Sequence, residues 1–143
     1  TEVVPGISSS ISVPALQGIP VTHRGASESF WVVTGTTSSG EISKDLYTAA
    51  KTDATIVVLM GVKKLKEIAE IFVAEGKSRL PAAVIQNGSM ENEKVVVATA
   101  GTIFETAQDH KIDSPALIIF GEVVGLHSKF QPIKAFYELS EQE

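Results

Sequence analysis

The chain has 143 residues, is 43% hydrophobic and carries a net charge of −5, which fits one globular domain and argues against a nucleic-acid-binding surface. No apolar run reaches the roughly 18 residues of a membrane span and no secretory signal pattern is present, so we expect a cytoplasmic protein without a membrane partner. Zero cysteines exclude disulfides and thiolate-bound zinc or iron–sulfur clusters.

Strand-like and helix-like segments alternate along the chain. Val3-Val4, before Pro5-Gly6, has the pattern of the last residues of a strand. The expected elements that follow are, in chain order, a short helix over Ser10–Gln17, a strand over Phe30–Gly35, a helix over Ser43–Ala50, a strand over Ala54–Met60, a helix over Val62–Gly76, strands over Pro81–Gln86 and Lys94–Thr99, a helix over Thr102–His110, a strand over Ala116–Val124 that contains or is bounded by Gly121, and a weaker helix pattern over Ile133–Leu139.

Local signals define the ends of some helices. Ser43 is a candidate N-cap for the second helix, and Gly76 is a candidate C-terminal stop for the third. Pro14 limits the first helix to one that is kinked or short. The basic cluster Lys63-Lys64-Lys66 alternates with acidic residues on an expected helix, so we interpret it as a solvated face.

The order of these elements predicts an α/β fold: a single layered lobe in which a roughly five-stranded mixed sheet is flanked by helices on both faces. In such sheets ligands bind at the carboxyl ends of strands. The strand ends selected by this rule are Pro5–Ser9, Gly35-Thr36, Met60-Gly61, Gln86–Gly88 and Thr99–Thr102.

Each of these signals also has a purely structural interpretation. Serines after Pro5-Gly6 can cap a helix or hydrogen-bond a ligand, and from spacing alone we favour capping. Met60 can fill a core gap or pack against a flat ring. Gly88 follows Asn87 as in an ordinary turn, or it lets a ring approach the backbone.

Catalytic motifs are not evident in the sequence. The three histidines, His23, His110 and His127, lack metal-ligand spacing, so we expect no metal site. No Walker loop, G-x-G-x-x-G motif or nucleophile elbow is present, and no acid–base pair can be assembled. Arg24, in GIPVTHRG, either fixes groups of its own protein or binds a ligand carboxylate.

The segment VVPGISSSISVPALQGIPVTHRG resembles the tetrapyrrole methylases, and within them the uroporphyrinogen-III C-methyltransferases, which use S-adenosylmethionine. The resemblance continues through FWVVTGT, VVLMG, PAAVIQNGS, EKVVVAT and SPALIIFGEVVGL, and so covers nearly all of Val3–His127. It implies that residues 1–127 are the C-terminal lobe of a two-lobe enzyme and residues 128–143 a tail. The expected catalytic residues would belong to the other lobe, and the catalytic base is unknown.

The resemblance also implies functional residues in this lobe. Those expected to bind S-adenosylmethionine are Ser8, Ser9, Met60, Gly88 and, as less certain neighbours, Ala100 and Gly101. Thr22 and Arg24 would lie nearer the tetrapyrrole, where a cation suits an octacarboxylate. All the cofactor residues fall on the strand ends selected above, so we expect them to share one cleft.

The implied reaction is methylation of uroporphyrinogen III to precorrin-2, on the way to sirohaem or cobalamin, by a homodimer. The resemblance does not decide between these two pathways. Two alternatives stay open: a different methylase of the superfamily, acting on a later corrinoid or on diphthamide, and a non-catalytic α/β binding module. We expect the chain alone neither to methylate nor to bind the cofactor tightly.

Overall fold

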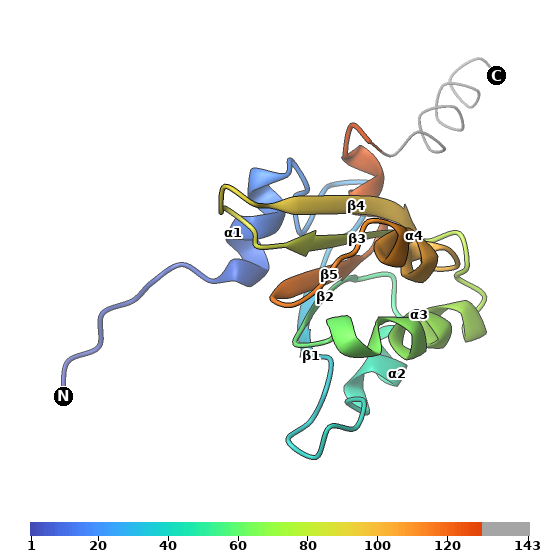
Figure 1. The fold of residues 1–143 in the computed structure, drawn as a ribbon, viewed down its shortest axis with the longest axis horizontal. Coiled ribbons are helices and arrows are strands. Elements are labelled where there is room, and N and C mark those ends of the chain that lie inside the picture. Colours follow the sequence, from blue (N-terminus) through green and yellow to red (C-terminus); the bar gives the residue numbers. More distant parts are fainter. Residues whose placement is uncertain (130–143) are drawn as a thin grey trace.

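A five-stranded mixed sheet forms the centre of the computed structural model, which describes residues 1–129 (Figure 1). Its strands are β1 (Phe30–Thr34), β2 (Thr55–Leu59), β3 (Pro81–Gln86), β4 (Lys94–Thr99) and β5 (Ala116–Phe120), in the spatial order β1-β2-β5-β3-β4. Strands β1 and β2 pair in parallel, and the other three pairs are antiparallel. The predicted α/β class and mixed sheet are confirmed; the helix expected over Ile133–Leu139 lies outside the described residues.

Helices cover both faces of the sheet (Figure 1). One face carries α2 (Asp45–Ala49), α3 (Leu65–Ala74), which follows the 3₁₀ turn η1 (Val62–Lys64), and α4 (Ile103–Asp109). The other carries α1 (Ser9–Leu16) and the 3₁₀ turn η2 (Glu122–Leu126). The core is therefore two apolar layers separated by the sheet.

Burial on both sides explains the two most apolar segments of the sequence. In β2, Ile56 and Val58 face the α2–α4 layer, while Val57 faces the α1 layer. In β5, Ile118 and Ile119 divide in the same way. Strands covered on both faces are apolar along nearly their whole length, which is why TIVVL and ALIIF show no alternation, with Thr55 as the one polar residue.

The α3 helix is fixed to the sheet by an aromatic pair. The rings of Phe72 and Phe120 stack with centroids 4.1 Å apart and planes inclined by 16°. Both side chains are almost fully buried. Such a contact contributes about 0.5–1.5 kcal/mol beyond the burial of area. The expected C-terminal stop is also found, because Gly76 has a left-handed φ of 78° directly after this helix.

Three expectations about element ends are wrong. Val3 and Val4 pair with no strand and are 86% and 83% exposed, because residues 1–8 leave the sheet as an extended arm (Figure 1). Ser43 makes no side-chain cap for α2, which begins two residues later. The last strand does not continue to Val124 but ends at Phe120, bounded by Gly121 as in the second of its two alternatives, since the chain turns into η2 and buries Val123 against the α1 face.

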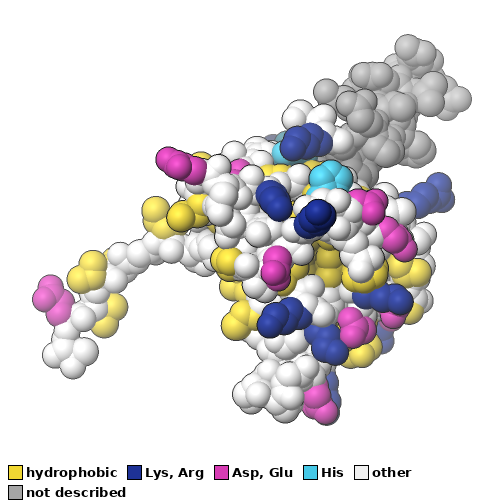
Figure 2. All heavy atoms as spheres, in the orientation of Figure 1, with side chains coloured by type: hydrophobic (Ala, Val, Ile, Leu, Met, Phe, Trp, Pro, Cys, Tyr) yellow, Lys and Arg dark blue, Asp and Glu magenta, His cyan; other side chains and the backbone are white. Residues whose placement is uncertain are grey.

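Charge is distributed without a single-sign patch on the side of the molecule drawn in Figure 2, where lysines and arginines alternate with acidic side chains. Among residues 1–129, no helix combines the length and apolar character needed to cross a bilayer.

Candidate functional site

The strand directions bring three carboxyl ends to the same side of the sheet. β1 and β2 run in parallel, and β3 has the same direction because β5 is antiparallel to both β2 and β3. We call the side where β1, β2 and β3 end the carboxyl edge, and the opposite side the amino edge. The amino ends of β4 and β5 also lie at the carboxyl edge.

A pocket of about 600 Å³ opens at the carboxyl edge, and three of the predicted cofactor residues line it. We call it the Met60 pocket. Its lining consists of Ser9, Val13, Leu59, Met60, Ile85, Asn87, Gly88, Met90, Pro115, Ala116 and Leu117. Most of these side chains are apolar, with a few hydrogen-bonding groups among them, as expected of a site for a flat organic ligand.

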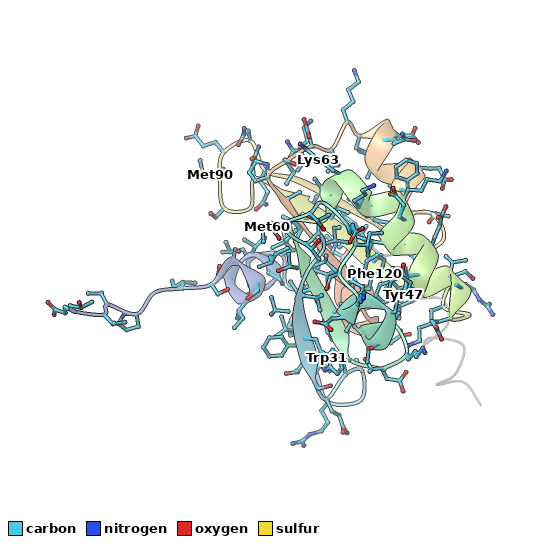
Figure 3. All side chains as sticks on the ribbon, turned by 90° about the horizontal axis from the view of Figure 1, so that it is seen from below. Trp31, Tyr47, Met60, Lys63, Met90 and Phe120 are labelled. Atoms are coloured by element: carbon cyan, nitrogen blue, oxygen red, sulfur yellow. The ribbon has the colours of Figure 1, made fainter. Side chains whose placement is uncertain are left out.

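A second hollow, of about 480 Å³, adjoins the first and shares Met60, Pro115 and Ala116 with it. We call it the lysine pocket, because Lys63 and Lys64 line it together with Thr36 and Gly40. Figure 3 shows Met60, Met90 and Lys63 at one end of the molecule, away from Trp31. The two hollows form a continuous groove with Met60 at its centre.

Met60 has a backbone and an exposure that core packing does not explain. Its φ of 54° is left-handed, and its side chain is 68% exposed. Asn87, at the end of β3, is also left-handed, with a φ of 51°. For a non-glycine residue this conformation costs about 1–2 kcal/mol. Strained residues concentrate at ligand sites, which favours the ring-packing interpretation of Met60 over the core interpretation.

Two glycines, Gly35 after β1 and Gly61 after Met60, let the ends of β1 and β2 come into contact. A Cβ on Gly35 would lie 2.4 Å from the Gly61 Cα, so the ends of β1 and β2 can touch only without side chains. The Gly35 N–H donates to the Leu59 carbonyl at 2.7 Å, and the Thr36 hydroxyl donates to the Met60 carbonyl at 3.0 Å. Met60 is therefore presented by a rigid turn.

Gly88 has a structural role of its own. A Cβ at this position would lie 2.5 Å from Cγ1 of Val13, so the absence of a side chain lets the β3–β4 loop pack against α1. Glu93 reinforces this contact, because its carboxylate accepts hydrogen bonds from the Gln17 side-chain amide and, at 2.8 Å, from the Ser89 N–H. The pocket wall formed by this loop is therefore attached to α1.

The two serines after Pro5-Gly6 have different positions. Ser8 is the N-cap of α1: its hydroxyl accepts a hydrogen bond from the Ser10 N–H at 3.3 Å and lies 2.6 Å from the Ser10 hydroxyl. The capping interpretation is thus confirmed for Ser8. Ser9 is exposed, lines the Met60 pocket and makes no side-chain hydrogen bond within residues 1–129, so its hydroxyl is free to bind a ligand.

The expectation that Ala100 and Gly101 share this cleft is wrong. They follow β4, which is antiparallel to β3, and so lie at the amino edge. The Ala100 N–H donates to the Leu80 carbonyl and the Gly101 N–H to the Ser78 carbonyl, both at 2.8 Å, just before β3 begins. The seven-residue loop Asn87–Glu93 was the available signal, because it is too short for the crossover that a parallel β4 would require.

Thr22 and Arg24 are also separated from the Met60 pocket. They belong to the turn closed by His23 and Ser27, and the Ser27 hydroxyl accepts from the Thr55 N–H at 3.0 Å, at the start of β2. The length of β2, about 16 Å, lies between this turn and Met60. Arg24 makes no hydrogen bond or ion pair in the described part of the chain; its contact with a tetrapyrrole stays a prediction.

Glu122 lies in a separate hollow at the amino edge, and the pKa of its carboxyl group is shifted. The hollow has a volume of about 470 Å³ and is also lined by Asp53, Lys77 and Arg79. Partial burial, followed by the negative charge of Asp53, raises the pKa of Glu122 above its usual 4.5. The folded state therefore holds this proton more tightly than the unfolded state.

We expect Glu122→Gln to stabilise the protein at pH 7 and to have a smaller effect at pH 4. Because the pKa is raised on folding, the wild-type carboxyl contributes stability below pH 4.5 that is lost as pH rises through the folded value. The neutral amide does not undergo this loss. Urea denaturation at both pH values measures the difference, with exposed Glu105→Gln on α4 as control. A stabilisation that is equal at both pH values would contradict this origin.

No cluster of three or more His, Cys, Asp or Glu side chains suited to a metal ion occurs within residues 1–129. The described groove also contains no histidine or carboxylate among its lining residues. What it can do chemically is bind an apolar ring, offer the Ser9 hydroxyl and present two ammonium groups.

Fold and groove together define an α/β protein with a largely apolar groove at the carboxyl edge of a mixed sheet. The model of the tetrapyrrole (corrin/porphyrin) methylases matches residues 1–103, and the chain belongs to this family.

Two relatives show the range of proteins that are similar to this chain. The chain is 43% identical over 129 residues to an S-adenosyl-L-methionine-dependent uroporphyrinogen III methyltransferase of Methanosarcina barkeri, with 88% of this chain and 51% of the relative covered. It is 40% identical to a siroheme synthase of Chromobacterium violaceum, covering 90% of this chain and 27% of the relative. The chain thus spans about half of the first relative and a quarter of the second.

A solved structure shows the same fold. The uroporphyrin-III C-methyl transferase of Thermus thermophilus, complexed with S-adenyl homocysteine, superposes with a TM-score of 0.71 at 35% identity. The match covers 87% of this chain and 54% of that chain. The predicted family and fold are therefore confirmed, while the roles of individual residues stay predictions.

Proposed function

We propose that this chain is one lobe of an enzyme that uses S-adenosylmethionine to methylate uroporphyrinogen III to precorrin-2. The observation that carries the proposal is the meeting of Ser9, Met60 and Gly88 at one pocket, although they lie far apart in the sequence. The names of the relatives support the substrate class. Homodimer formation, which the resemblance implies, and a cytoplasmic location, which the sequence pattern predicts, both stay predictions.

The groove suits the cofactor in both size and chemistry. Met60, Met90 and Leu117 provide apolar contacts for an adenine ring, and polarizable thioethers pack well on aromatic faces. The Ser9 hydroxyl and the loop around Asn87 provide hydrogen-bonding groups at the pocket wall. When bound, S-adenosylmethionine supplies a methyl group already activated by its sulfonium.

The residues of this chain would contribute binding and orientation rather than proton transfer. The rigid Gly35–Gly61 contact fixes Met60, and a methyl transfer depends strongly on how closely the reacting atoms are aligned. The apolar lining would keep water away from the methyl group. Since the groove lacks a histidine or carboxylate among its lining residues, the proton acceptor is expected in the half of the enzyme that this chain does not match.

The proposal is tested with two proteins: the chain 1–143, and a two-lobe protein in which it is joined to the half of the Methanosarcina barkeri relative that it does not match. We expect only the two-lobe protein to bind S-adenosylhomocysteine with micromolar affinity in calorimetry. It should also add two methyl groups to uroporphyrinogen III, as measured by mass spectrometry.

Each other outcome favours a different interpretation. Micromolar binding by 1–143 alone would contradict a cofactor site divided between two lobes. Methylation of a later corrinoid but not of uroporphyrinogen III would indicate another methylase of the family. Cofactor binding without turnover of any tetrapyrrole would indicate a binding module.

A further inference from the structure

The lysine pocket is cationic, although the protein as a whole is negative. Lys63 and Lys64 line it, and no acidic residue does. Three acids lie close to the lining without belonging to it: Glu41 follows Gly40, Glu67 pairs with Lys64 at 3.1 Å, and the Asp113 carboxylate accepts a hydrogen bond from the Ser114 N–H at 2.7 Å. A ligand with negative charge would therefore meet local attraction from Lys63 at this end of the groove, although the whole chain carries a net charge of −5.

The three lysines of the cluster differ in what they already contact. Lys64 pairs with Glu67 at 3.1 Å, and the ammonium group of Lys66 lies 5.9 Å from the ring centroid of Phe104. Lys63 is exposed and has neither a hydrogen bond nor an ion pair within the described range 1–129. It is the member of the cluster whose charge is uncommitted and directed to the groove. The interpretation of the cluster as only a solvated face is therefore incomplete.

We propose that Lys63 binds a carboxylate of the ligand that packs on Met60. The inference rests on the proposed function, in which both ligands carry carboxylates: one on the methionyl part of the cofactor and several on the tetrapyrrole. Lys63 is three residues from Met60 along the chain, and both line the lysine pocket (Figure 3). A ligand that covers Met60 places any carboxylate on that side within reach of a flexible ammonium group.

Position within the fold favours Lys63 over Arg24 for this role. Arg24 lies at the amino edge, beyond the start of β2, whereas Lys63 lies in η1 at the carboxyl edge, two residues after Gly61. Arg24 was the expected cation because the family resemblance places the segment GIPVTHRG near the tetrapyrrole. Because β2 starts at the amino edge and ends at the carboxyl edge, Lys63 lies beside the groove and Arg24 lies at the far end of the strand.

The test uses Lys63→Gln in the two-lobe protein, with Lys66→Gln as the matched control and Arg24→Gln as the rival cation. Calorimetry is done with S-adenosylhomocysteine and with 5′-methylthioadenosine, which keeps the adenosine and lacks the carboxylate. The KM for uroporphyrinogen III is measured for each variant. We expect Lys63→Gln to weaken carboxylate binding about fivefold, as the loss of one partly exposed ion pair would.

The two ligands distinguish the two sources of the carboxylate. A fivefold weaker affinity for S-adenosylhomocysteine, with unchanged affinity for 5′-methylthioadenosine, would assign Lys63 to the cofactor carboxylate. Unchanged cofactor affinity with a fivefold higher KM would assign it to the tetrapyrrole. Either result supports the proposal if Lys66→Gln leaves both quantities unchanged.

Three results would overturn the proposal. One is a Lys63→Gln variant with wild-type affinity and KM, another an equal effect of Lys66→Gln, and the third an effect of Arg24→Gln alone. In each case the unmodified two-lobe protein still methylates, so the proposed function stands. Loss of methylation by the unmodified protein would count against the proposed function and, with it, against this role of Lys63.

Discussion

Gly35→Ala should lower the free energy of unfolding of the chain by about 3 kcal/mol. The new Cβ would lie 2.4 Å from the Gly61 Cα and 3.0 Å from the Gly61 nitrogen. These are backbone atoms, so no side-chain rotation can remove the clash. The ends of β1 and β2 must separate, and the hydrogen bond from the Gly35 N–H to Leu59 would be lost with them. Urea denaturation of residues 1–143 measures the change.

Gly6→Ala is the matched control for this substitution. Gly6 has no atom within 4 Å of the position a Cβ would take, and it lies in the exposed arm. The same methyl group added there should change stability by less than about 0.5 kcal/mol. Equal stabilities of the two variants would mean that β1 and β2 do not approach as closely as described, and that Met60 is not held by a rigid turn.

Strand identity was predictable from the sequence because burial leaves a strong composition signal. ALIIF, and TIVVL after its first residue Thr55, are apolar at every position since helices cover both faces of the sheet at β2 and β5. The same reasoning failed at Val123-Val124, which are equally apolar yet form a 3₁₀ turn. Apolar residues report burial, and burial alone does not distinguish the end of a strand from a turn packed against it.

Strand direction was not predictable from composition, and this explains the errors in the site. Met60 and Gly88 follow strands that end at the carboxyl edge, whereas Ala100 and Gly101 follow one that ends at the amino edge. All three strands have a similar sequence signature, an apolar run followed within a few residues by glycine. Only the pairing partner decides on which side the glycine lies, and loop length was the one local clue to it.

Exposure and backbone conformation added information that no motif contains. Ser8 and Ser9 are adjacent and chemically identical, yet the first caps α1 while the second faces the pocket. The sequence could not distinguish Lys63 from Lys64 and Lys66, which contact Glu67 and Phe104. In both cases the distinction depends on which side chain already has a contact within the lobe, and the sequence does not contain that information.

Met60→Ala should reduce the affinity of the two-lobe protein for S-adenosylhomocysteine at least about tenfold while leaving its stability nearly unchanged. The side chain is 68% exposed in this lobe, so its removal leaves no cavity. It would become buried only against a ligand, and burial of a methionine side chain is worth about 1.5–3 kcal/mol, which corresponds to a tenfold or greater loss.

Met60→Gly separates the two roles of this position. The left-handed φ of 54° is strained for methionine but easily adopted by glycine, so this variant should be at least as stable as the wild type. Its affinity for the cofactor should nevertheless fall as in Met60→Ala. A substitution that does not destabilise the protein and weakens binding shows that the strain is maintained for the ligand.

Calorimetry and urea denaturation of the same preparations provide both measurements, with Leu126→Ala as the control. Leu126 is 49% exposed in η2, which follows β5 at the amino edge, so its truncation should change neither quantity. If Met60→Ala and Met60→Gly both bind S-adenosylhomocysteine as the wild type does, the carboxyl edge of this sheet does not contact the cofactor. The pocket lined by Ser9, Met60 and Gly88 would then no longer support the proposal of methyl transfer.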